Sequence, residues 1–206
     1  MNRATGGCRL ALSVIAALLA LAACGGGNAP SRFYTLSPLT GGDGPRGTAT
    51  RERGMAIGVG PVRLPEYLNR PQIVTRTGPN EFQVAEFNQW GGPLEAEFAR
   101  VLTENLSTLL PADRVAIFPW SMPYPATYRV QVAVARFEAE ASGEVSLVAR
   151  WSIVGRDGKD AMRAGQSSFR EAGGKQDFDG MVAAMSRALG GLSREIAAAL
   201  GSLPPG

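Results

Sequence analysis

Histidine is absent from this chain of 206 residues, and only two cysteines are present. Both cysteines, Cys8 and Cys24, lie close to the N-terminus, so a domain formed by the later residues has no disulfide. Without histidine and cysteine, the common zinc sites and the Ser-His-Asp and Cys-His nucleophile systems are excluded. We therefore expect no catalytic residue, no metal site and no cofactor.

Lysine is nearly as scarce, and it occurs only at Lys159 and Lys175. Both lie in turn sequence rich in glycine and aspartate, where a buried base of lowered pKa is not expected. Carboxylates remain, but Glu138, Glu140 and Glu144 surround a predicted turn and resemble a solvated cluster rather than a desolvated acid–base pair. We expect that the protein is not an enzyme.

The net charge is also small, because 21 Lys and Arg residues are nearly balanced by 18 Asp and Glu residues. Loss of an N-terminal signal would remove Arg3 and Arg9 and reduce the excess further. The densest basic stretch, Arg51-Glu52-Arg53, contains an acid. We therefore expect no nucleic-acid partner.

The first 23 residues have the pattern of a secretory signal. Two arginines precede an apolar run over residues 10–21, which only Ser13 interrupts. The run suits a signal peptide, whereas a membrane span needs about 20 apolar residues. The four residues Leu21-Ala22-Ala23-Cys24 resemble the lipobox of bacterial lipoproteins. We predict a lipoprotein signal peptide over residues 1–23 and lipid attachment, such as palmitate, at Cys24; an ordinary signal cleaved near Ala23 is the alternative.

The expected anchor places the mature protein at a membrane. Residues 24–31 predict a short tether to a folded domain over residues 32–206. Fully extended, this tether keeps the domain within about 25–30 Å of the bilayer. In double-membrane bacteria an aspartate after the lipidated cysteine typically retains a lipoprotein at the inner membrane. Gly25 therefore indicates the periplasmic face of the outer membrane.

Strands are predicted from short apolar or alternating runs. Residues 37–54, rich in glycine, predict an exposed loop, and Gly58 and Gly60 suggest that another backbone approaches closely. Residues 128–139 alternate, with Val134 and Arg136 expected on the same face. The predicted strands are 33–36, 55–62, a hairpin of 72–77 and 81–85, 115–118, and a meander of 128–139, 144–154 and a strand ending near Phe169.

Two long helices are predicted, one from Pro93 to Leu110 and one that follows Asp177 and ends near Leu200. Each has an apolar stripe at helical spacing that is expected to face the core. Gly190-Gly191 predicts a kink or a close packing approach in the second helix. We therefore expect a single α/β (α+β) domain, with a mixed, mainly antiparallel sheet of about six strands packed by two long helices.

Residues 64–76, LPEYLNRPQIVTR, closely resemble the signature of the PqiC/YmbA family, the ABC-transport auxiliary lipoproteins. Trp90-Gly91-Gly92-Pro93-Leu94, with Asn105 in the helix that follows, and the early Phe33-Tyr34-Thr35-Leu36 match the family as well. The resemblance covers most of the mature chain and is sharpest between Ile57 and Leu110. It implies an outer-membrane-anchored periplasmic subunit of an MCE/ABC-type transenvelope lipid transport system that supports membrane integrity.

The same resemblance implies that the protein docks an MCE-domain partner from the inner membrane, and that it can form a homo-oligomeric ring. The candidate partner-contact residues form a rigid segment of aromatic and basic character: Pro65, Tyr67, Leu68, Arg70 and Pro71. An alternative is that Tyr67 and Leu68 fill the end of the core while Arg70 pairs with an acid such as Glu86. A different function, activator or scaffold of a cell-wall synthase, also fits an anchored domain, but such an activator would need a longer tether.

Overall fold

A computed structural model describes residues 30–40, 55–110, 112, 114–120, 125–158, 160–175 and 177–204. All of these except Pro30 belong to one compact unit, Ser31–Gly206. The predicted signal peptide, Cys24 and Gly25 lie outside the described residues, as does most of the tether and of the predicted loop 37–54. Among the residues described, no helix is long and apolar enough to cross a membrane.

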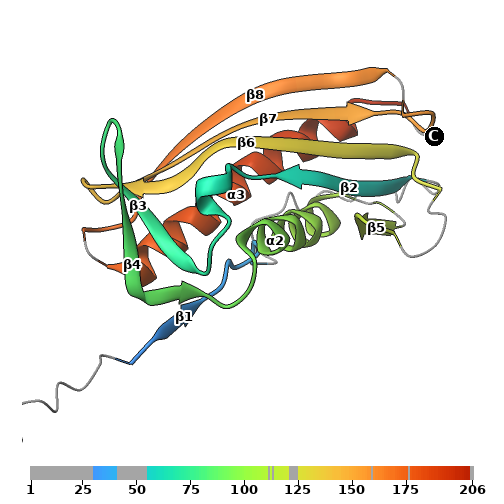
Figure 1. Cartoon of the computed structure of the whole chain (residues 1–206). Coiled ribbons are helices and arrows are strands. Elements are labelled where there is room, and N and C mark those ends of the chain that lie inside the picture. The colour runs from blue at the N-terminus through green and yellow to red at the C-terminus, as the bar shows by residue number, and fades with distance from the viewer. Residues whose placement is uncertain are drawn as a thin grey trace, which may run out of the picture. The chain divides into compact units, whose positions relative to one another are not determined.

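Within the described residues, eight strands form one sheet (Figure 1). Six of them follow the order β1-β4-β3-β6-β2-β5, and β7 and β8 extend the sheet from β6. The strands are β1 (Arg32–Tyr34), β2 (Ala56–Arg63), β3 (Gln72–Gly78), β4 (Glu81–Trp90), β5 (Arg114–Ile117), β6 (Tyr128–Glu140), β7 (Glu144–Val154) and β8 (Ala161–Ala172). The mixed α+β fold is confirmed, with eight strands rather than about six. The short β1 and β5 also join the sheet, each through parallel pairing with a distant strand.

The two longest pairings, β6–β7 and β7–β8, are the antiparallel meander that the sequence predicts. On its other edge, β6 is shared by two parallel strands. β2 pairs with β6 as far as Ala133, and β3 pairs with it again at Ala139 and Glu140. The segment between β2 and β3 therefore lies next to the part of β6 where pairing with β2 ends and pairing with β3 begins.

A register shift interrupts β6 between Val134 and Arg136. Before the shift the strand pairs Val134 with buried Ala149, and after it Phe137 pairs with buried Leu147. A β-bulge adds one residue to a strand, so the side chains that face the helices change from even to odd positions. The expectation that Arg136 shares a face with Val134 is therefore wrong.

Helices α2 (Leu94–Leu109) and α3 (Phe178–Gly201) have nearly the predicted bounds. In Figure 1, α3 crosses the sheet along β6, β7 and β8, and α2 lies beside β2 and β5. Asp177 caps α3, since its carboxylate accepts a hydrogen bond of 3.1 Å from the Asp179 N–H. The ring of Phe98 from α2 meets Phe137 of β6 edge-on, with centroids 5.2 Å apart. The two helices and the sheet thus enclose one core.

A buried polar contact joins the helices to the segment after β1. Asn105 of α2 is fully buried, donates to Ser193 Oγ of α3 at 3.0 Å, and accepts from the Leu39 N–H at 2.7 Å. Next to it, a Cβ on Gly190 would lie 2.8 Å from Leu39 Cδ2, and one on Gly191 would lie 2.7 Å from Phe169 Cε1. Because α3 runs through both positions as one helix, the glycines serve close packing, one of the two predicted roles.

Candidate partner-binding site

The signature segment between β2 and β3 is short and internally hydrogen-bonded. It contains a single 3₁₀ turn, η1 (Glu66–Leu68), in which the Leu68 N–H donates to the Pro65 carbonyl at 3.0 Å. Proline fixes the backbone on both sides of the turn, at Pro65 and Pro71, and removes two N–H donors. The segment therefore cannot continue either neighbouring strand, and it leaves the sheet as a compact projection.

Four donors surround the fully buried carboxylate of Glu138 on β6, and one of them is Arg136, whose Nε donates to Oε1 at 3.4 Å. The Tyr67 hydroxyl donates to Oε2 at 2.8 Å, Arg76 Nε donates to Oε1 at 2.9 Å, and the Phe137 N–H donates to Oε2 at 2.9 Å. The ring of Phe82 stacks on Tyr67, with centroids 4.4 Å apart, and lies 4.3 Å from the guanidinium of Arg76. We call Tyr67, Arg76, Phe82 and Glu138 the Glu138 cluster.

Burial of Glu138 overturns the expectation that it belongs to a solvated acidic cluster. The expectation considered only neighbours in sequence, whereas η1 and the β3–β4 hairpin bring the covering groups from far along the chain. Both carboxylate oxygens accept hydrogen bonds, so the arrangement stabilises the fold and does not form a proton-transfer pair. Sequence reasoning chose Tyr67 for another role, and the signal that it missed is that Tyr67 and Arg76 both belong to the signature.

The electrostatics of the Glu138 cluster follow from burial and charge. Burial, and then the hydrogen bond to Glu138, raise the pKa of Tyr67 to about 12. Burial is the largest single influence on the pKa of Arg76 and acts to lower it, but the hydrogen bond and charge of Glu138, together with Tyr67, outweigh burial and the pKa is raised. Breaking a buried ion pair by removing one partner costs about 3–5 kcal/mol. The cluster therefore fixes the signature segment on the sheet.

The five predicted contact residues divide into two groups. Leu68 is buried in the core and Tyr67 packs against it, as the alternative interpretation expects. Pro65 is half-buried, whereas Arg70 and Pro71 are exposed. No ion pair joins Arg70 to Glu86 in the part of the chain that the structure describes, and Glu86 is exposed as well. Arg70 and Pro71 therefore remain open to a partner.

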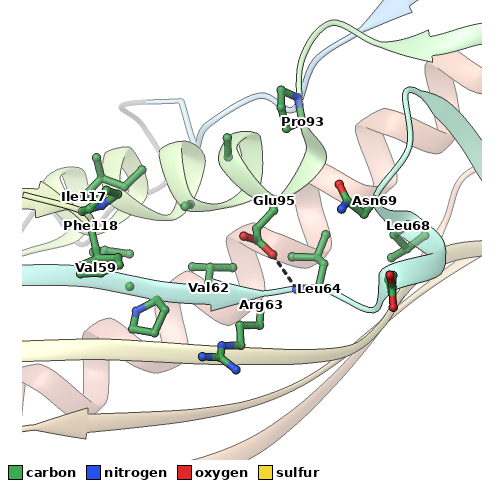
Figure 2. A pocket seen from close by; sticks show the side chains of 16 residues that line it. Val59, Val62, Arg63, Leu64, Leu68, Asn69, Pro93, Glu95, Ile117 and Phe118 are labelled. Carbon is green, nitrogen blue, oxygen red and sulfur yellow. Dashed lines mark hydrogen bonds between the residues drawn. The ribbon is translucent and has the colours of Figure 1, made fainter.

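A groove of about 650 Å³ lies directly beside the signature segment, between β2 and the first turns of α2. Figure 2 shows Glu95 of α2 directed toward β2, where its Oε2 accepts a hydrogen bond of 3.2 Å from the Leu64 N–H. We call this the β2 groove. Its lining consists of Val59, Gly60, Pro61, Val62, Arg63, Leu64, Glu66, Leu68, Asn69, Pro93, Glu95, Ala96, Ala99, Ile117, Phe118 and Pro119. Sequence analysis gave no indication of it.

Aromatic side chains lie against two glycines of β2, and one of these side chains, Phe118, lines the groove. Gly60 has a φ of +125°, and a Cβ there would lie 2.7 Å from Phe118 Cβ. A Cβ on Gly58 would lie 2.5 Å from the indole of Trp120. The close approach predicted at these glycines is therefore real, but side chains rather than a backbone make it. Across the described residues, no group of acidic, histidine or cysteine side chains could hold a metal ion.

Comparison with known proteins identifies a family and a shared fold. The family model for the ABC-type transport auxiliary lipoprotein component matches residues 34–197. The intermembrane transport lipoprotein PqiC of Escherichia coli strain K12 is 29% identical over 140 residues, which are 68% of this chain and 72% of PqiC. PqiC of Shigella flexneri matches equally. The crystal structure of protein XCC0632 from Xanthomonas campestris has a TM-score of 0.67 at 16% identity, over 83% of this chain and 99% of that one.

Proposed function

Because the chain belongs to the family of ABC-type transport auxiliary lipoprotein components, we propose that it docks an MCE-domain protein at the outer membrane. Its relatives in Escherichia coli and Shigella flexneri are intermembrane transport lipoproteins, which supports a place in lipid transport between the membranes. The protein supplies a fixed binding surface, and its partner spans the periplasm from the inner membrane.

One observation carries the docking role, namely that Arg70 and Pro71 are exposed on a segment that is fixed from both sides. On one side, Leu68 is buried and the Tyr67 hydroxyl binds Glu138. On the other, the Pro71 carbonyl accepts a hydrogen bond of 2.6 Å from the Trp90 N–H. A surface that is already ordered loses little conformational entropy on binding, and arginine is enriched among residues that dominate binding energy.

Membrane placement rests on the sequence before the described residues. Acylation of Cys24 with more than one chain would hold the protein firmly at a bilayer. Gly25 favours the outer membrane, and the short tether would keep the domain beneath it. A homo-oligomer would present several copies of the signature segment to one partner.

Two experiments test this function. The full lipoprotein, solubilised in detergent, should co-purify with an MCE-domain protein of the same bacterium, and it should fractionate with outer membranes. Gly25→Asp should move it to the inner membrane and abolish its function in the cell. A chain that never associates with the MCE-domain protein, or that functions fully with aspartate at position 25, would contradict the proposal.

A further inference from the structure

The second half of β2 has an open edge. β5 pairs with β2 from Ala56 to Val59 and ends at Ile117. β2 continues to Arg63, and on its other side it pairs with β6. Over residues 60–63, no described strand covers the edge that faces α2. Pro61 has no N–H and the register of β2 shifts between Val59 and Val62, so the backbone N–H groups of this edge that can pair with an added strand begin at Val62.

The end of β5 explains why this edge is open. The Phe118 N–H still donates to the Val59 carbonyl at 2.8 Å, but the next residue is Pro119, which has no N–H and cannot extend the ladder. The positions that a longer β5 would occupy belong instead to the β2 groove. The groove is therefore in line with an existing strand.

At the far end of the groove, a side-chain carboxylate accepts a hydrogen bond that a backbone carbonyl of a neighbouring strand would otherwise accept. The Leu64 N–H donates to the Glu95 carboxylate and not to a backbone carbonyl. Alternate residues of a strand direct their backbone groups to the same side, so the N–H of Val62 faces the groove as the N–H of Leu64 does. The backbone of β2 along the groove is thus arranged to pair with an extended chain.

The two ends of the groove differ in chemistry. At one end Ile117 and Phe118 are 39% and 47% exposed, which is unusual for large apolar side chains at a concave surface. At the other end Glu66 and Glu95 supply two carboxylates. Figure 2 shows the Arg63 side chain pointing away from Glu95 and α2, so it does not neutralise them. An occupant with an apolar residue at one end and a cationic residue at the other is complementary.

From this arrangement we propose that the β2 groove binds an extended segment of the docked MCE-domain protein, which adds to β2 as a strand in line with β5. An apolar side chain of that segment contacts Ile117 and Phe118, and a lysine or arginine pairs with Glu95. The inference rests on the proposed function and specifies how the partner is held. A lipid acyl chain is a poorer occupant, because it would cover the carboxylate and the backbone N–H groups without binding them.

Affinity measurements on the full lipoprotein and the purified MCE-domain protein test the proposal. Phe118→Ser and Glu95→Lys should each weaken binding about tenfold. The matched controls are Phe33→Ser, which removes another exposed phenylalanine, and Glu104→Lys, which makes the same charge change on α2 outside the groove. Both should stay within about twofold of the wild type. A lysine or arginine of the partner changed to glutamate should restore binding to Glu95→Lys.

Hydrogen exchange on the unmodified protein tests strand addition without any substitution. The amides of residues 62–64 should exchange more slowly in the complex, and a photo-crosslinker at position 118 should label one short stretch of the partner. Normal binding by both groove variants, or exchange at residues 62–64 unaffected by the partner, overturns the inference and leaves the docking function intact. Loss of self-association by Phe118→Ser with unchanged partner binding, or labelling of lipid, overturns it as well. Absence of binding by the wild type overturns the proposed function itself.

Discussion

The hydroxyl of Tyr67 donates a 2.8 Å hydrogen bond to the buried carboxylate of Glu138, which lies 71 residues later in the chain. This bond joins the signature segment to the middle of the fold. It also changes the role of Tyr67, because a side chain that binds a buried charge and packs on Phe82 has little surface left for a partner. The signature thus combines residues that hold the segment with residues that it exposes.

Loss of the Tyr67 hydroxyl should destabilise the fold. Tyr67→Phe leaves one oxygen of a buried carboxylate short of a donor, which costs about 1–3 kcal/mol. Tyr34→Phe is the matched control, since the Tyr34 hydroxyl donates at 3.0 Å to the uncharged Asn88 side chain and its loss should cost about 0.5–1.5 kcal/mol. Urea unfolding measures both free energies. A loss at Tyr67 no larger than at Tyr34 would contradict the role of the buried charge.

Stability should fall at high pH through the same tyrosine. The pKa of Tyr67 is raised to about 12, against about 10 in an unfolded chain. A raised pKa means that the contribution is complete below pH 10 and is lost as the pH rises toward 12. The free-energy difference between wild type and Tyr67→Phe should therefore shrink between pH 10 and pH 12. A difference that stays constant over this interval would show that Tyr67 ionises as freely as in the unfolded chain.

Gly60 should not tolerate a side chain. Gly60→Ala would force alanine to a φ of +125° and place its Cβ 2.7 Å from Phe118 Cβ. Strain of this kind costs about 1–3 kcal/mol, seen as a lower melting temperature. Gly92→Ala is the control, because nothing lies within 4 Å of its Cβ, and its effect should be neutral or stabilising by up to about 1 kcal/mol. Equal melting temperatures for the two variants would argue against a close approach at β2.

Asn105 should matter through its two buried hydrogen bonds. Asn105→Ala leaves the Leu39 N–H and the Ser193 hydroxyl without this partner, at a cost of about 1–3 kcal/mol. Because the two side chains contact each other, the loss in Asn105→Ala/Ser193→Ala should be smaller than the sum of the single losses. Strict additivity in chemical unfolding would mean that the two residues act independently.

Local patterns in the sequence predicted the helices, the hairpin and the meander, whose formation depends on residues that are close together in the chain. Both helices were found from their apolar stripes, and the capping role of Asp177 follows from its place at the start of α3. The hairpin and meander were found from alternation and turn residues. The burial of Glu138 was not predicted. The bulge after Val134 changes which side chains of β6 face the helices, and the groups that cover Glu138, Tyr67 and Arg76, come from distant parts of the chain.

The candidate site divides in the same way. The signature segment was recognised from its resemblance to the family signature over residues 64–76, and its proline, tyrosine and arginine residues indicated a rigid contact surface. The β2 groove could not be predicted, because it exists only where a parallel strand, β5, ends before its neighbour β2. That relation depends on long-range pairing, and no single stretch of the chain contains it.

The affinity of the MCE-domain protein for this lipoprotein and for its Arg70→Glu variant tests the central claim most directly. Arg70 is exposed, so its replacement should leave the melting temperature unchanged and weaken binding by about tenfold or more, or about 1.4 kcal/mol. The control is Arg163→Glu, which makes the same charge change at an exposed position on β8. Weaker binding by Arg70→Glu alone is the predicted result, and equal affinities for the wild type and both variants would contradict docking through the signature segment.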